Sequence, residues 1–275
     1  MQCFEPISIP RPNGRGKADR ITVPCGKCAA CLTNRRNDWS RRLAYEHENS
    51  ISAYFVTLTY DDDNIVYGSY YGTLIKKHLQ DYIKRIRDAI KPDKIRYYAV
   101  GEYGTTTKRP HYHILIFNLP QSELYRLAEK WTYGYIQVGQ VTGASIHYVT
   151  KYHVNRNDFP DGSAPGFTIQ SNKPGIGYAY IEKNRQYHEG NPLRGHLFLR
   201  GGLKCRLPRY YKDKLYNSTE RERMSSQVVS PEFDDNRIED HYRNNPDVNY
   251  YDYLLQLKDD YSKKFKVKIN KNNKL

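Results

Sequence analysis

The pattern of apolar and polar residues along the chain predicts short strands that alternate with helices. Apolar residues recur every three or four positions in 34–48, 73–90, 121–131 and 144–153, a spacing that gathers them on one face of a helix. β-Branched and aromatic runs at 52–60, 95–102, 109–117 and 134–141 are typical of strands. This order of elements predicts an α+β fold with a central, largely antiparallel sheet flanked by helices.

The two ends of the chain carry weaker signals. Residues 1–24 are polar and rich in Pro and Gly, which predicts an irregular arm, and residues 155–173 have the composition of a loop. Residues 177–182 and 195–200 are candidate strands, and 208–216 begins like a helix. We therefore expect four parts: a Cys-rich arm and basic helix (1–50), a core (51–155), accessory strands and a helix that complete the domain (156–217), and a charged, partly flexible tail (218–275).

Two histidines two positions apart in a predicted strand carry the clearest chemical signal. Side chains alternate along a strand, so His111 and His113 point to the same face. If the preceding loop is centred between Thr106 and Thr107, Glu102 lies across from His111 on that face. A carboxylate and two imidazoles suit a divalent cation with open positions for substrate oxygens. Histidines that merely pack on the sheet are the alternative.

Composition and charge add a class of partner. The hydrophobic content of 38% is that of a globular protein, and with no long apolar run or signal peptide we expect no membrane span and no secretion. A net charge of +14 favours a polyanion such as nucleic acid, and some of the 27 tyrosines are expected to stack on bases. The cations that could contact a DNA backbone, or simply be solvated, are Arg35, Arg36, Arg41, Arg42, Lys108 and Arg109.

Four of the five cysteines lie before residue 32, three of them in the spacing CxxCxxC at Cys25, Cys28 and Cys31. Without a secretory signal the pattern favours a structural Zn²⁺ or an iron–sulfur cluster over disulfides. Cys3 is the preferred fourth ligand, because it would close a loop around the arm, and His47 and Cys205 are substitutes. Reduced thiols in a turn are the alternative.

Four motifs in order complete the sequence evidence. Tyr148-Val-Thr-Lys-Tyr152 places two phenols on one helical face. With Phe55-Val-Thr-Leu-Thr59, Gly101-Glu-Tyr-Gly104 and Arg109-Pro-His-Tyr-His113 it resembles the motif set of HUH endonucleases, which initiate rolling-circle DNA replication. The two tyrosines and the CxxCxxC with its basic helix are similar in particular to the initiators of gokushovirus-type microviruses, small phages with circular single-stranded DNA. One departure is that some relatives use three histidines, where this chain offers Glu102.

The resemblance implies an RRM-like core and a site-specific single-strand DNA endonuclease and strand-transferase. Mg²⁺ or Mn²⁺ at the three ligands would activate the scissile phosphate, and Tyr148 or Tyr152 would attack it to leave a 5′-phosphotyrosine, with Lys151 compensating phosphate charge. The implied partners are a single-stranded DNA origin and the host helicase and polymerase, in the cytoplasm of a bacterial host. A relaxase or transposase of the HUH class, or a non-catalytic zinc-stabilised nucleic-acid-binding protein, are the other interpretations.

Overall fold

The computed structural model describes residues 3–11, 14, 16, 19–152, 159–191, 194–199, 201–226 and 235–272. The chain forms two compact units, which are described separately. The cysteine unit comprises residues 1–35, 192–195 and 216–275, and the sheet unit comprises residues 36–191 and 196–215.

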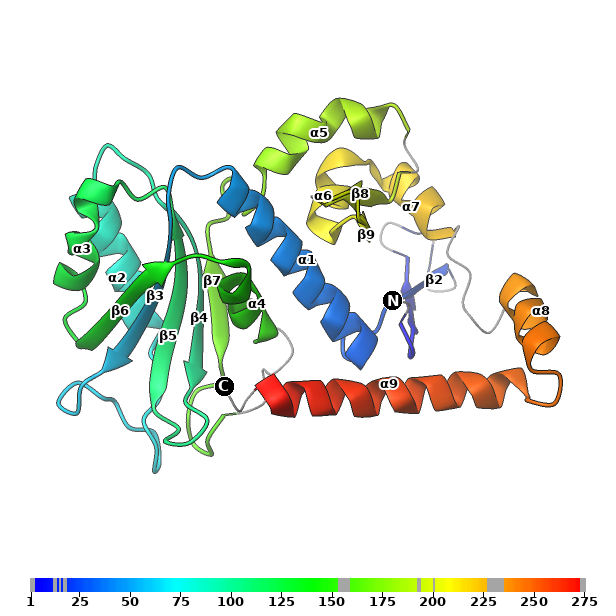
Figure 1. Cartoon of the computed structure of the whole chain (residues 1–275), viewed down its shortest axis with the longest axis horizontal. Helices are drawn as coiled ribbons and strands as arrows, with labels where there is room; N and C mark the ends of the chain where they lie inside the picture. Colours follow the sequence, from blue (N-terminus) through cyan, green and yellow to red (C-terminus); the bar gives the residue numbers. More distant parts are fainter. Residues whose placement is uncertain are drawn as a thin grey trace. The chain divides into compact units, whose positions relative to one another are not determined.

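A five-stranded antiparallel sheet lies at the centre of the sheet unit (Figure 1). The strand order is β6-β3-β5-β4-β7. The bounds are β3 (Ala53–Tyr60), β4 (Arg96–Tyr103), β5 (Pro110–Phe117), β6 (Gly134–Gln140) and β7 (Phe167–Gln170). The central β5 is buried along most of its length, which explains its nearly continuous apolar sequence. The predicted α+β fold is confirmed.

Helices cover the two faces of this sheet (Figure 1). On one face lie α2 (Lys76–Ala89), the 3₁₀ turn η1 (Gln121–Glu123) and α3 (Tyr125–Glu129), and Leu79 and Leu127 enter the apolar cluster there. On the other face lie α4 (Gly143–Lys151) and the later part of α1 (Ala29–Glu48), where Leu43 and Val149 join Leu115 in a second cluster. His111 and His113 share the face of Leu115, so α4 lies on their side of the sheet.

Accessory elements complete the sheet unit and attach to α1. They are α5 (Ala179–Glu189), the antiparallel pair β8 (His196–Phe198) and β9 (Lys204–Arg206), and α6 (Arg209–Leu215). The guanidinium of Arg42 lies 4.1 Å from the ring centroid of Trp39 and 4.0 Å from that of Tyr210. The buried Glu46 accepts hydrogen bonds from Arg96 of β4 and from the Gly177 amide. These charge-assisted bonds hold α1 on the sheet.

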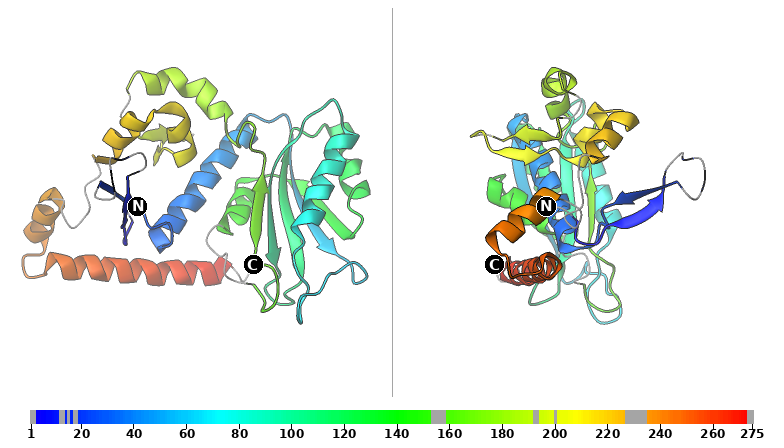
Figure 2. Two further views of the ribbon diagram at one scale, coloured as in Figure 1. Left: turned by 180° about the vertical axis from the view of Figure 1, so that it is seen from behind. Right: turned by 90° about the vertical axis from the view of Figure 1, so that its right-hand side faces the viewer.

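The cysteine unit contains the first turns of α1, a hairpin and three helices. The bounds are β1 (Ile7–Pro10), β2 (Arg20–Val23), α7 (Ser218–Ser226), α8 (Asp235–Asn244) and α9 (Tyr250–Asn272); Figure 2 shows the hairpin and the long α9 from two further directions. Tyr261 of α9 donates a hydrogen bond to Thr33 at 3.2 Å, and its ring centroid lies 5.5 Å from that of Phe4. No helix in the described part of the chain is both long and apolar enough to cross a membrane.

The segment 177–182, predicted as a strand, is instead the beginning of helix α5. Tyr180, Ile181 and His188 are the buried residues of α5, and the Tyr180 hydroxyl lies 2.8 Å from Nε2 of His188. One side of a helix gathers residues at this spacing. The short apolar run is therefore the first turn of a helix that polar residues continue.

Two segments predicted as irregular contain short strands. Residues 167–170, inside the predicted loop 155–173, pair with the outer edge of β4, and residues 7–10 of the arm pair with 20–23. Strands of four residues depend on their pairing partner more than on their own pattern, so sequence alone misses them. Residues 153–158, which include the end of the predicted helix 144–153, lie outside the described residues.

Several helix boundaries also differ from the prediction. Helix α1 begins at Ala29, ahead of the predicted residue 34. Helix α2 begins at Lys76 instead of Thr73, because the amides of Leu74 and Ile75 donate hydrogen bonds to tyrosine hydroxyls and stay outside the helix. The predicted helix 121–131 is a 3₁₀ turn followed by the short α3, and the charged tail carries α7, α8 and α9 where it is described.

Candidate active site

The hairpin of β4 and β5 brings Glu102 and the two histidines together. Glu102 pairs with His111 in the strand register, as the loop spacing predicts, and Val100 pairs with His113. Oε1 of Glu102 lies 2.8 Å from Nε2 of His111 and 2.8 Å from Nε2 of His113. One ligand atom from each of the three residues lies within 4.8 Å of the others, a geometry that could hold a metal ion.

Burial and hydrogen bonding set the charge of this group. Burial raises the pKa of Glu102, but hydrogen bonds from His111 and His113 outweigh it and lower the pKa to about 2. Burial lowers the pKa of His113, although Glu102 partly opposes this. A carboxylate and a neutral imidazole are the protonation states that bind a cation, so the donor set fits a divalent metal.

Neighbouring groups orient both imidazole rings. Nδ1 of His111 donates to the carbonyl oxygen of Arg109 at 3.1 Å, and Nδ1 of His113 lies 3.0 Å from the hydroxyl of Thr57. The ring of Phe55 stacks on His113 with a centroid separation of 5.4 Å. A partner at Nδ1 directs Nε2 toward Glu102, as the outer partners of metal-binding histidines do. Sequence analysis missed Thr57 and Phe55 as supporting residues, although both belong to the Phe55–Thr59 motif.

Helix α4 delivers Tyr148 to the same point. The helix begins with a capping box between Thr142 and Ser145, and Ile146, Val149 and Thr150 form its buried side. The Tyr148 hydroxyl donates to Oε1 of Glu102 at 2.9 Å and lies 3.3 Å from Nε2 of His113. Burial and the charge of Glu102 both raise the pKa of Tyr148, so its phenol is protonated near neutral pH.

Tyr152 and Lys151 lie at the end of α4, beside Tyr148. The Tyr152 ring centroid is 5.7 Å from that of Tyr148. Nζ of Lys151 lies 3.8 Å from the Tyr148 ring centroid and 4.9 Å from that of Tyr152. Burial lowers the pKa of Lys151, although Glu102 acts in the opposite direction. The structure thus places Tyr148 within the ligand group, with Tyr152 beside it and the Lys151 cation over both rings.

The six cations predicted to contact DNA occupy different environments. Arg42 is packed between aromatic rings and donates from Nε to the Ile176 carbonyl at 3.0 Å, which is a packing role. Arg109 donates from Nη2 to the Tyr60 carbonyl at 2.7 Å and pairs with Asp62 at the end of β3. Arg35 is exposed, and the half-buried residues are Arg36, Arg41 and Lys108.

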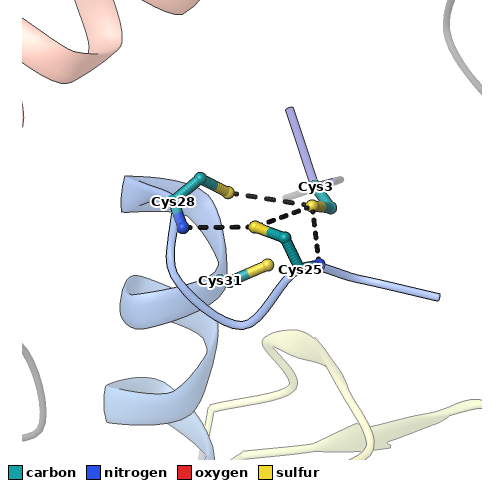
Figure 3. A group of neighbouring side chains, drawn as sticks. All are labelled: Cys3, Cys25, Cys28 and Cys31. Atoms are coloured by element: carbon teal, nitrogen blue, oxygen red, sulfur yellow. Dashed lines mark hydrogen bonds between the residues drawn. The ribbon is translucent and has the colours of Figure 1, made fainter. Parts of the chain in front are cut away.

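The predicted cysteine ligands also converge, in the cysteine unit (Figure 3). Sγ of Cys3 lies 3.5 Å from Sγ of Cys25 and 3.8 Å from Sγ of Cys28, and the four sulfurs, including that of Cys31, all lie within 4.8 Å of one another. The group closes with Cys3, and the proposed substitute Cys205 lies in β9 of the other unit. Burial raises the pKa of Cys25, but amide donors, first that of Cys28, outweigh it and lower the pKa to about 7.

Comparison with known proteins identifies relatives of this chain. A family model for replication-associated proteins of the ORF2 type matches residues 53–157. Replication-associated protein VP4 of Bdellovibrio phage phiMH2K is 32% identical over 215 residues, which cover 70% of this chain and 67% of that protein. Replication-associated protein ORF2 of Spiroplasma virus 4 is 28% identical, with 70% and 68% covered, and ORF4 of Chlamydia phage 1 is 28% identical, with 70% and 53% covered.

Proposed function

Because this chain belongs to the phage replication-associated proteins, we propose that it is a metal-dependent endonuclease and strand-transferase of the HUH class that starts rolling-circle replication. The observation that carries the proposal is the hydrogen bond between the Tyr148 hydroxyl and Glu102 inside the histidine group. A tyrosine nucleophile beside a cation-binding donor set is the arrangement that phosphodiester transfer requires.

Glu102, His111 and His113 would hold Mg²⁺ or Mn²⁺. When bound, the cation would supply Lewis-acid activation of the scissile phosphate. The Tyr148 oxygen attacks phosphorus, the new Tyr O–P bond forms as the P–O3′ bond breaks, the phenol loses its proton and the departing 3′ oxygen gains one. The products are a 5′-phosphotyrosine and a free 3′-hydroxyl, which can prime a host polymerase in the bacterial cytoplasm.

The remaining residues of α4 support a second transfer. The phosphotyrosyl linkage is a diester like the bond it replaces, so attack by a 3′-hydroxyl rejoins DNA without ATP. Tyr152 supplies a second nucleophile for the next cut while Tyr148 still holds the first end. The Lys151 cation, close to both rings, offsets the negative charge of the phosphate during both transfers.

The test is formation of a covalent protein–DNA adduct. Single-stranded oligonucleotides that tile the phage genome encoding this chain, incubated with the protein and Mn²⁺, should include one that yields a denaturation-resistant adduct by gel and mass spectrometry. Chelation by EDTA should prevent it. A non-catalytic nucleic-acid-binding protein would bind the oligonucleotides and yield no adduct with any of them, which would refute the proposal.

For the cysteine unit we propose a structural Zn²⁺ held by Cys3, Cys25, Cys28 and Cys31. Four thiolates are a common ligand set for structural zinc, and they can enclose the ion tetrahedrally. The site would link the N-terminal arm to the first turn of α1, where a small unit has little apolar core.

Replacing Cys28 with Ser is expected to reduce bound zinc from about one ion per chain to a small fraction, because a hydroxyl is a far weaker zinc ligand than a thiolate. The measurement is metal content by mass spectrometry of the purified protein. Cys205→Ser, which removes a thiol outside the group, is the matched control. Unchanged zinc in the Cys28 variant, or iron with visible absorbance in the parent protein, would contradict the assignment.

A further inference from the structure

The side of the sheet that carries the histidines is covered only in part. On β4 the residues of this face, Tyr98, Val100 and Glu102, are buried beneath α1 and α4. On β3 the residues of the same face beyond Ala53 are half-buried, although every residue of the opposite face is buried. Gly139 of β6 meets no atom within 4 Å of the position that a Cβ would occupy, so the space above it is open. An uncovered strip therefore runs along β3 and β6 beside the candidate active site.

Tyr135 stands on this strip in register with the metal ligands. Strand pairing aligns Glu102 with His111, His111 with Thr59, and Thr59 with Tyr135. Residues paired in this way share a face, and neighbouring strands are about 4.8 Å apart, so Tyr135 lies roughly 10 Å from His111 across the sheet. The Tyr135 side chain is 69% exposed although the strand around it is well packed. An exposed aromatic ring next to a phosphate-cleaving site has the position of a base-stacking platform.

The surroundings of Tyr135 complement a nucleic acid strand. Thr57, Thr59 and Gln137 lie on the same face and offer hydroxyl and amide groups. The Arg109 guanidinium contacts the Tyr60 carbonyl at the end of β3, one residue beyond Thr59, and Lys151 lies over the Tyr148 ring. Cations at both borders of an open polar strip with one exposed ring match a phosphodiester backbone with an unpaired base.

We propose that the strip formed by Thr57, Thr59, Tyr135 and Gln137 binds single-stranded DNA next to the scissile phosphate, with one base stacked on Tyr135. The inference rests on the proposed nuclease function and adds the binding surface to it. A duplex would hide its base faces, so the platform selects an unpaired substrate. A stacked base would also fix the register of the strand and so the phosphate that reaches Tyr148.

The experiment compares three variants in a Tyr148→Phe, Tyr152→Phe background, which binds without cutting. Tyr135→Thr retains strand propensity and loses the ring, Tyr135→Phe keeps the ring, and Tyr125→Thr removes a tyrosine that is 58% exposed on α3, on the opposite face. The probe is the oligonucleotide that forms the adduct, labelled for fluorescence anisotropy and carrying 2-aminopurine at each position around the nick in turn. Its duplex form is measured in parallel.

Tyr135→Thr should weaken single-strand binding roughly tenfold, and Tyr135→Phe should stay within about twofold of the parent. The salt dependence of binding should not change, because a tyrosine releases no counterions. One 2-aminopurine position should be quenched in the parent and in the Tyr125 variant and regain fluorescence in Tyr135→Thr.

Two outcomes would overturn the platform while leaving the nuclease intact. One is unchanged affinity and quenching in Tyr135→Thr when the parent forms its adduct. The other is a change in the size of the free protein on gel filtration, which would make the strip a contact between copies of the chain. Absence of an adduct from the parent would instead count against the nuclease itself.

Discussion

Replacing Tyr148 with Phe is expected to lower the rate of the first adduct formation by about a thousandfold or more, since the substitution deletes the attacking oxygen and nothing else. The Tyr148 hydroxyl contacts both Glu102 and His113, at 2.9 Å and 3.3 Å. The measurement is the single-turnover rate of adduct formation with Mn²⁺ and the origin oligonucleotide. Single-strand affinity should stay close to that of the parent, because the ring remains.

Tyr152→Phe is the matched control for this prediction. Tyr152 is on the same helix, and its ring packs against that of Tyr148, so a general disturbance of α4 would affect both variants equally. We expect Tyr152→Phe to form the first adduct at nearly the parent rate and to fail in a second cut by the same molecule. The assignment of Tyr148 as first nucleophile is wrong if the two variants show the reverse order.

Replacing Glu102 with Gln is expected to weaken Mn²⁺ binding by about a hundredfold or more. The amide has nearly the same shape but lacks the charge, and loss of a direct ligand exceeds the roughly 10- to 100-fold cost of losing an outer partner. Glu102 is 6% exposed, so water cannot easily replace its oxygen. Calorimetry and Mn²⁺ electron paramagnetic resonance measure this binding without reference to cleavage.

Cleavage by the Glu102 variant should recover in part when Mn²⁺ is raised, because the defect is in cation affinity and the nucleophile is intact. Glu129→Gln is the control, since Glu129 is an exposed carboxylate of α3 on the opposite side of the sheet. Equal Mn²⁺ affinity in the Glu102 variant and the parent would remove Glu102 from the ligand set.

Much of the candidate site follows from local rules. Strand alternation places His111 and His113 on one face, and the length of one hairpin loop pairs Glu102 with His111. Both rules act over about ten residues, within the reach of sequence reasoning. Helix periodicity likewise predicts that Tyr148 and Tyr152 share one side of a helix, although not where that side is directed.

Elements whose existence depends on distant partners were harder to predict. β7 is a strand because β4 offers a free edge, and the hairpin of β1 and β2 encloses residues of turn-like composition. The segment at 177–182 has an apolar run short enough to suit a strand or a helix, and only the burial of Tyr180, Ile181 and His188 shows the helix.

The sequence by itself determined the α+β class, the donor set of two histidines and a glutamate, and the cysteine spacing, because each rests on short-range periodicity. Tertiary structure alone decided that Tyr148 reaches Glu102, 46 residues away in the chain, that Cys3 closes the thiol group, and that Tyr135 stands on an uncovered strip. Those arrangements depend on how helices pack on the sheet and which strands they leave open, and packing between distant segments leaves no periodic trace in the chain.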